Sequence, residues 1–223
     1  MKKSVLMLLA LLFSFSQLRA EKYAAEFITI GVGARALGMG GAFTPVADDA
    51  SAAYWNPAGL VQLNKREVHF MHASMFSDML QNDVFTVALP GRQFALGLNY
   101  MRLGIDDIPY TTRLDMNDRP LIEKYISDIE EAVFLSFGAA VNAKFSLGGN
   151  VKGLRQNIGD HSSLGFGLDL GLLYHISSAL TLGAILQDIS GTHITWDNGH
   201  RDAKMPELKY GLAYKKSILF LRS

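Results

Sequence analysis

The chain has 223 residues, equal numbers of basic and acidic residues (21 each) and no Cys. This length allows one sizeable domain. The balanced charge shows no basic footprint for nucleic acid, so nucleic acid is not an expected partner. The lack of Cys excludes a disulfide scaffold, a thiolate metal site, a Cys nucleophile and the lipidated Cys of a bacterial lipoprotein. Any membrane attachment must therefore come from the fold itself.

Residues 1–20 are predicted to be a cleaved signal peptide. They combine a positive n-region, an apolar h-region and a small residue at the cleavage point: Lys2 and Lys3, residues 5–15, and Ala20. A retained transmembrane helix would need roughly 20 apolar residues, which this segment lacks. We expect the mature chain to begin near Glu21. Because Leu18 is not small, cleavage after Ala24 or Ala25 is an alternative.

From about Val68 onward, apolar residues alternate with small or polar ones. In residues 164–176 every second residue is Leu, Phe, Tyr or Ile, and most of the others are Gly, Asp or His. A period of two predicts a strand with one apolar face. Further strands are predicted at residues 93–101, 132–141, 180–188 and 208–214.

The second face of these strands decides between two kinds of β fold. A β-sandwich or a small soluble barrel would carry many charges there, because that face would meet water. Here it carries mostly Gly, Ala, Ser and Asn. That composition favours an antiparallel transmembrane β-barrel with its apolar face on lipid. Four tyrosines near the ends of apolar runs suit an aromatic girdle, although buried core tyrosines are the alternative: Tyr100, Tyr174, Tyr210 and Tyr214.

The connections alternate in length. Short turns are predicted at residues 89–93, 144–146 and 177–179, and long polar loops at residues 102–131 and 190–206. Short turns at one end and long loops at the other are typical of outer-membrane barrels. We count eight or nine strands, the last at residues 218–221, and expect this chain to be the N-terminal part of a longer barrel.

Residues 31–60 differ from the rest and are rich in glycine, including Gly38, Gly40 and Gly41. Glycine permits tight turns and close packing. Asp48 or Asp49 is expected to cap a short helix that ends before Asn56-Pro57. We predict that residues 21–66 form a plug, or hatch, against the inner wall, and that residues 67–223 form the barrel strands.

A dinucleotide-binding site is the sharper alternative for the start of this block. Residues 27–30 followed by Gly31-x-Gly33-x-x-Ala36 match the strand, glycine turn and helix of that fingerprint. However, the glycines continue to Gly41, and Pro45 interrupts the helix that the fingerprint requires. We therefore expect no nucleotide or other cofactor.

The combined pattern of residues 33–60, GARALGMGGAFTPVADDASAAYWNPAGL, resembles the N-terminal region of the PorV/PorQ outer-membrane proteins, relatives of the FadL fatty-acid transporters. The resemblance implies a barrel of about fourteen strands with an internal N-terminal segment. It also implies that Asn56, Pro57 and Ala58 match the Asn-Pro-Ala motif near the FadL hatch. The expected location is the bacterial outer membrane.

The sequence offers no convincing catalytic or metal site. His69 and His72 would point to opposite faces of a strand, so that they could not share an ion. The adjacent acids at residues 48–49, 106–107 and 130–131 have no partner group that would make them an acid–base pair. No Gly-x-Ser-x-Gly elbow occurs. We expect a protein that is not an enzyme.

The resemblance implies two functions. A PorV-like protein would bind secretion-system proteins and the C-terminal domains of exported cargo in type IX secretion. A FadL-like protein would pass hydrophobic small molecules through the outer membrane. The closer resemblance to PorV favours the first function. Outer-membrane lipid is the expected surrounding in both cases.

Overall fold

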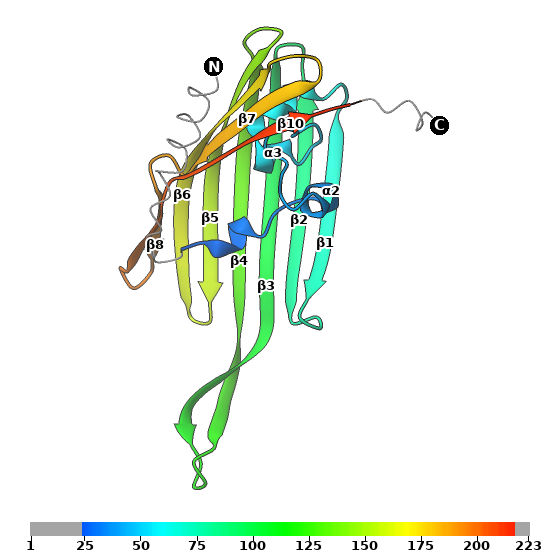
Figure 1. Cartoon of the computed structure of the whole chain (residues 1–223). Coiled ribbons are helices and arrows are strands. Elements are labelled where there is room, and N and C mark those ends of the chain that lie inside the picture. The colour runs from blue at the N-terminus through cyan, green and yellow to red at the C-terminus, as the bar shows by residue number, and fades with distance from the viewer. Residues whose placement is uncertain (1–23, 217–223) are drawn as a thin grey trace, which may run out of the picture.

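A computed structural model describes residues 24–216 of the chain. The predicted signal peptide and the strand predicted at residues 218–221 lie outside the described residues. Short helical segments come first and β-strands follow (Figure 1). The helical segments are η1 (Glu26–Thr29), α2 (Ala34–Gly38), α3 (Ala52–Trp55) and η2 (Pro57–Gln62).

The described strands form one 10-stranded antiparallel sheet. They are β1 (Glu67–Met75), β2 (Leu80–Pro90), β3 (Phe94–Leu114), β4 (Pro120–Ala140), β5 (Phe145–Ile158), β6 (His161–His175), β7 (Leu180–Gln187), β8 (Thr192–Trp196), β9 (Arg201–Lys204) and β10 (Glu207–Tyr214). Neighbours along the main path follow the order β1-β2-β3-β4-β5-β6-β7-β10. The sheet curls into a half-barrel, which confirms the all-β, antiparallel, barrel-like fold (Figure 1).

The two faces of the sheet differ as the alternation predicted. On β6, the side chains of Phe166 and Leu168 are 70% and 45% exposed on the convex face, whereas Asp169 on the concave face is 4% exposed. The same pattern of exposed apolar and buried small residues continues along β3, β4 and β5. The convex face is therefore an apolar surface. The concave face is lined mainly with small and polar side chains, together with a few buried apolar ones such as Met101, Phe134 and Leu154.

A row of charged residues ends this apolar surface. Cross-strand pairing aligns five residues of β1 to β5 on the convex face, with basic or imidazole groups alternating with acids: His72, Asp83, Arg102, Glu131 and Arg155. His72 Nδ1 lies 2.7 Å from Asp83 Oδ1, and the Tyr100 hydroxyl donates to Glu131 Oε1 at 2.6 Å. Like charges do not oppose each other in the row, which favours this register.

The expected long loop at residues 102–131 is wrong. β3 and β4 remain paired as far as Leu114 and Pro120 and form a hairpin that projects beyond the sheet (Figure 1). At about 3.3 Å per residue, the part beyond Arg102 is on the order of 40 Å long. The polar residues that suggested a loop are exposed on both faces of this ribbon. At its tip, Asp115 Oδ1 accepts the backbone N–H groups of Asn117 (2.7 Å) and Arg119 (2.9 Å).

The expected loop at residues 190–206 also contains strands. β7 pairs with β6 at Leu170–His175, and β8 then takes over the same edge of β6 at Ser163–Phe166. On the next position outward, β10 pairs with β7 and β9 pairs with β8. β7 and β8 thus occupy the same position in the sheet, next to β6. The strand is interrupted between them at Asp188, whose φ is 54°. Short turns join β2 to β3, β4 to β5 and β6 to β7 as expected, but the middle one spans residues 141–144 and not the expected 144–146.

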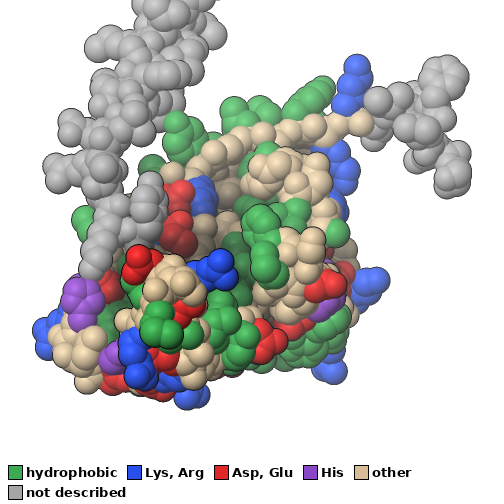
Figure 2. Space-filling view, turned by 90° about the horizontal axis from the view of Figure 1, so that it is seen from below, with side chains coloured by type: hydrophobic (Ala, Val, Ile, Leu, Met, Phe, Trp, Pro, Cys, Tyr) green, Lys and Arg blue, Asp and Glu red, His purple; other side chains and the backbone are tan. Residues whose placement is uncertain are grey.

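The N-terminal block, residues 24–62, fills the concave side of the sheet. Figure 2 looks into the curled sheet from the end of the projecting hairpin. Residues of the block and the inner wall form one hydrophobic cluster that includes Phe27, Ile28, Val32, Met101 and Leu154. Burial of these apolar side chains provides the main force that holds the block in place.

Candidate functional site: the N-terminal block and the inner wall

The Asn-Pro-Ala motif is buried against the inner wall at the start of η2. Asn56 is completely buried, and its side-chain amide donates to the carbonyl oxygens of Thr44 and Leu172, both at 3.0 Å. Its Oδ1 accepts the backbone N–H of Ala58 at 3.2 Å. Pro57 occupies the first helical position, where no N–H is needed. Asn56 therefore links two parts of the block to β6.

Glycines of the inner wall make room for this motif. Gly138, Gly148 and Gly171 are aligned across β4, β5 and β6 by the strand register. A Cβ added to any of them would lie closer than 3.0 Å to an atom of the Asn56-Pro57-Ala58 segment. The missing side chains let the two backbones approach each other, as the Gly-rich inner face suggested.

Two further glycines of the inner wall contact the turn of the N-terminal block that precedes the Asn-Pro-Ala motif. Gly183 of β7 is aligned with Gly211 of β10, and both lie under Pro45. A Cβ on Gly183 would lie closer than 3.0 Å to the Pro45 backbone. The small residues of the inner face thus follow the outline of the block across the sheet.

Two aromatic residues of α3 tie the first residues of the block to this contact. The Tyr54 hydroxyl donates to the Ile28 carbonyl and Trp55 Nε1 donates to the Val32 carbonyl, each at 2.7 Å. The Tyr54 ring also packs edge-to-face on Phe134 of β4, with ring centroids 5.9 Å apart. Burial raises the pKa of Tyr54, so its phenol stays neutral and keeps its hydrogen bond. The sequence prediction missed this anchor.

The predicted glycines and acids of the block lie apart from the motif. Gly38 ends α2, and Gly40 and Gly41 lie in the turn that follows it, with φ of 64° and 76°. Asp48 and Asp49 pair with Arg35 at 2.5 and 3.3 Å, and the Asp48 carboxylate raises the pKa of the Arg35 guanidinium. The structure brings Asn56, Pro57 and Ala58 together against the wall, but not these residues.

The expected helix cap needs one correction. α3 does end before Asn56-Pro57, but its N-cap residue is Ser51 and not an aspartate. Asp49 Oδ1 instead accepts hydrogen bonds from the backbone N–H and the hydroxyl of Ser51, at 2.9 and 2.5 Å. Asp49 lies two residues before the N-cap position. Its side chain therefore stabilises the turn that leads into α3 and does not cap the helix.

A buried ionic cluster occupies the inner wall at the break between β7 and β8. Lys152 Nζ lies 2.8 Å from Asp169 Oδ1 and also contacts Asp188 Oδ1. Thr192 donates to Asp188, and the Asn150 amide donates to Asp169 Oδ2 at 3.0 Å. The side chains of the three charged residues are at most 1% exposed. Sequence analysis missed this cluster, because its members lie on β5, on β6 and at the break between β7 and β8. Only the register between these strands brings them together.

The backbone at the break depends on this cluster. The N–H of Asp188 donates to Asp169 Oδ1 at 2.9 Å, so one carboxylate holds both Lys152 and the chain turn. One cation faces two carboxylates, and Asp188 Oδ2 is buried with no hydrogen-bond partner in the described residues. Removal of the cation would leave uncompensated negative charge inside the wall.

The remaining acids and histidines do not converge. His69 and His72 point to opposite faces of β1, and Glu130 and Glu131 to opposite faces of β4, where Glu130 accepts from the Gln156 amide. Within residues 24–216, no group of three or more His, Asp or Glu side chains is placed to hold a metal ion. Residues 26–29 form a 3-10 helix, so the strand that the dinucleotide fingerprint requires is not present there.

The comparisons with known proteins assign the family. Residues 13–163 match the family described as Uncharacterised protein family (UPF0164), and the chain therefore belongs to that family. No curated protein matches the chain. Among the helices that the structure describes, none has the length and apolar character needed to cross a membrane.

Proposed function

We propose that this protein is an outer-membrane β-barrel protein whose convex face contacts lipid and whose N-terminal block is an internal hatch. The observation that carries the proposal is the apolar convex face. Phe166, Leu168 and Leu170 are exposed in succession on β6, and so are Leu96 and Leu98 on β3. A soluble protein rarely exposes so continuous an apolar surface. Strands that span a bilayer expose such a surface to lipid.

The limits of this face support the same orientation. The row from His72 to Arg155 ends it on one side, and short turns end it on the other. Beyond the charged row the outward residues are mostly small or polar: Ser74, Gln81, Gly104, Asn157 and Ser162. In outer-membrane barrels the short turns face the periplasm. The projecting hairpin would then lie outside the cell.

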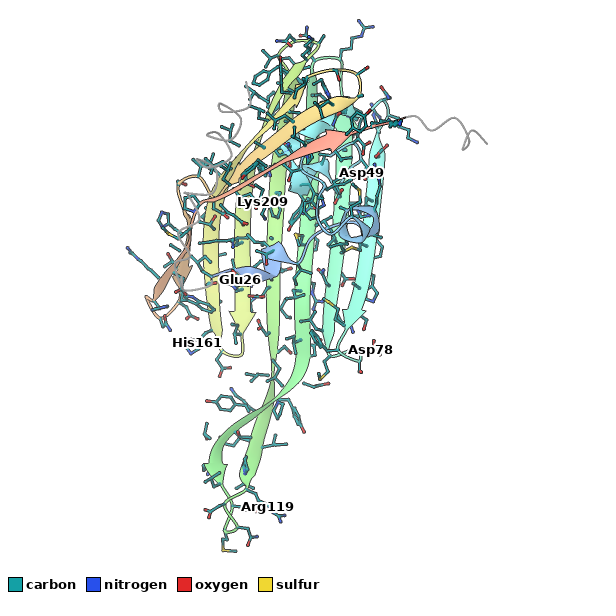
Figure 3. The ribbon with its side chains drawn as sticks, viewed as in Figure 1. Glu26, Asp49, Asp78, Arg119, His161 and Lys209 are labelled. Carbon is teal, nitrogen blue, oxygen red and sulfur yellow. The ribbon has the colours of Figure 1, made fainter. Side chains whose placement is uncertain are left out.

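For the biochemical role, we propose a PorV/PorQ-type component that binds exported proteins or secretion partners. The hairpin supports this role, because residues beyond Ile105 on β3 and before Ser127 on β4 pair only with each other along the backbone. Its exposed apolar side chains include Leu114, Met116 and Tyr125. Free strand edges next to apolar side chains are typical of surfaces that receive extended segments of other proteins. Figure 3 labels Arg119 at the tip of this hairpin.

FadL-like transport is the second candidate, and one observation favours it. The block covers an apolar part of the inner wall formed by Met101, Leu154 and Ile194. Movement of Phe27 and Ile28 away from this wall would expose an apolar path inside the barrel. This role predicts reduced uptake of labelled long-chain fatty acids in a strain that lacks the gene.

The deciding experiment is quantitative mass spectrometry of medium, periplasm and surface fractions from strains with and without the gene. Accumulation of proteins that share a C-terminal domain in the periplasm of the deletion strain is the expected result. A strain that carries the gene without residues 106–127 tests the hairpin separately. An unchanged secreted proteome together with impaired fatty-acid uptake would replace the secretion role with the transport role.

A further inference from the structure

The short-turn edge of the sheet carries exposed basic residues from separate parts of the chain. They precede β1, lie in the β2–β3 and β4–β5 turns, and follow β10: Lys65, Arg66, Arg92, Lys144, Lys215 and Lys216. The strand registers place these segments at the same end of the sheet. We call these six residues the basic edge.

The basic edge keeps its positive charge exposed in the part of the chain that the structure describes. Within residues 24–216, none of its members forms an ion pair. The opposite end is different, because its turns carry acids such as Asp78, Asp115, Asp160 and Asp197. Figure 3 labels Asp78 at that end. The charge is therefore polarised along the strands although the whole chain is neutral.

Aromatic residues separate the basic edge from the apolar convex face. Phe94 follows Arg92 closely and stacks on Phe137 with ring centroids 5.6 Å apart. Tyr214, 70% exposed, directly precedes Lys215. Aromatic rings at the headgroup level followed by cations beyond them are typical of protein surfaces that contact a bilayer interface.

We infer that the basic edge binds the anionic headgroups of phospholipids in the periplasmic leaflet of the outer membrane. This inference rests on the proposed membrane location, because only an embedded convex face places the edge at headgroup depth. Charge complementarity and continuity with the aromatic residues identify the ligand as a phosphodiester lipid headgroup. Long Lys and Arg side chains can reach such headgroups while their apolar stems stay near the acyl chains.

The test compares vesicles of phosphatidylcholine alone with vesicles that contain about one third phosphatidylglycerol, at low ionic strength. The product of the full-length gene is mixed with each, and the vesicle-bound fraction is measured by flotation. Insertion is measured separately, by protection of the strands from protease. We expect anionic lipid to increase binding of the wild type at least about tenfold, since each surface cation contributes roughly a fivefold factor. Salt at about 1 M should remove the difference, because the Debye length falls to about 3 Å.

Two charge-matched variants identify the surface. K65Q/R66Q/R92Q/K144Q should lose the preference for anionic vesicles while it still inserts. R113Q/R119Q/K124Q/R201Q, which removes four positive charges at the opposite end, should keep it. Insertion with equal binding to both vesicles, or equal loss in both variants, would overturn the headgroup inference and leave the membrane proposal standing. Failure of the full-length gene product to insert into either vesicle would overturn the membrane proposal and this inference with it.

Discussion

Gly148 of β5 lies directly under Ala58 of the N-terminal block, so close that a Cβ on the glycine would clash with the Ala58 backbone nitrogen. This contact joins two segments that are far apart in the sequence. It explains why a strand with an apolar outer face has glycine on its inner face. The inner wall and the N-terminal block are complementary in shape at the level of the backbone.

Gly148→Ala should therefore destabilise the protein by about 1–3 kcal/mol, the usual cost of overpacking. Gly153→Ala on the same strand is the matched control, because a Cβ there meets nothing within 4 Å. The control should be neutral or slightly stabilising, since alanine is favoured over glycine within a strand. Denaturant unfolding in detergent measures both variants. Equal stability of the two would show that the contact is looser than described.

Lys152→Met should cost about 3–5 kcal/mol, because it leaves Asp169 and Asp188 buried without their cation. Adding Asp188→Asn should restore part of the loss, and a double-mutant cycle measures the coupling. Lys124→Met is the control, because it removes a cation whose ion pair with Asp160 is exposed, and it should change stability little. A similar small effect at Lys152 would contradict the structural role assigned to the buried cluster.

Asn56→Asp should destabilise the packing of the N-terminal block more than Asn56→Ala. The alanine variant loses hydrogen bonds to two carbonyl oxygens, and each unsatisfied buried group costs about 1–3 kcal/mol. The aspartate would place a carboxylate oxygen against one of those carbonyls. Protease cleavage within residues 24–62 of folded protein reports release of the N-terminal block from the inner wall. Asn64→Ala, at an exposed position, should leave the cleavage rate unchanged.

Leu168→Arg tests whether the convex face contacts lipid. An arginine on the lipid face near the bilayer midplane costs about 2–4 kcal/mol of folding free energy in vesicles. Ser162→Arg, beyond the charged row, should be nearly neutral. Folding titrations in vesicles and in detergent compare the variants. Equal effects of the two substitutions in vesicles would argue against an embedded face.

The base of the projecting hairpin should keep its position over a wide pH range. Lys124 of the hairpin hydrogen-bonds Asp160 of the β5–β6 turn, which lowers the pKa of Asp160 from 3.8 and raises the pKa of Lys124 from 10.5. The stabilisation from Asp160 is present above pH 3.8 and is lost as the pH falls through its lowered pKa. The stabilisation from Lys124 is present below pH 10.5 and is lost as the pH rises through its raised pKa.

This prediction can be measured with spin labels, because the chain has no native Cys that would also react. Labels on Met116→Cys and Thr195→Cys should give the same distance distribution from about pH 5 to about pH 9. Asp160→Asn should broaden the distribution at all of these values. A wild-type distribution that broadens within that interval would disprove the role of the ion pair.

Some features could be predicted from local sequence. Residues 164–176 predicted β6 and its two faces, because alternation with a period of two needs no knowledge of the neighbouring strands. The glycine content of residues 31–60 predicts close packing, because glycine has no side chain to keep two backbones apart. The polar composition of residues 102–131 misled the prediction, because a two-stranded ribbon exposed on both faces has the composition of a loop.

The sequence alone determined that this chain is a β protein with one apolar and one small-residue face, because the side-chain period is a local property of the backbone. Only the tertiary structure decided which glycines lie under Asn56-Pro57-Ala58 and that Lys152 meets Asp169 and Asp188. Those contacts depend on strand register, and a shift by one residue would turn each inner side chain to the outer face. Register is fixed by pairing between strands and by packing against the N-terminal block, and neither is encoded in any short segment.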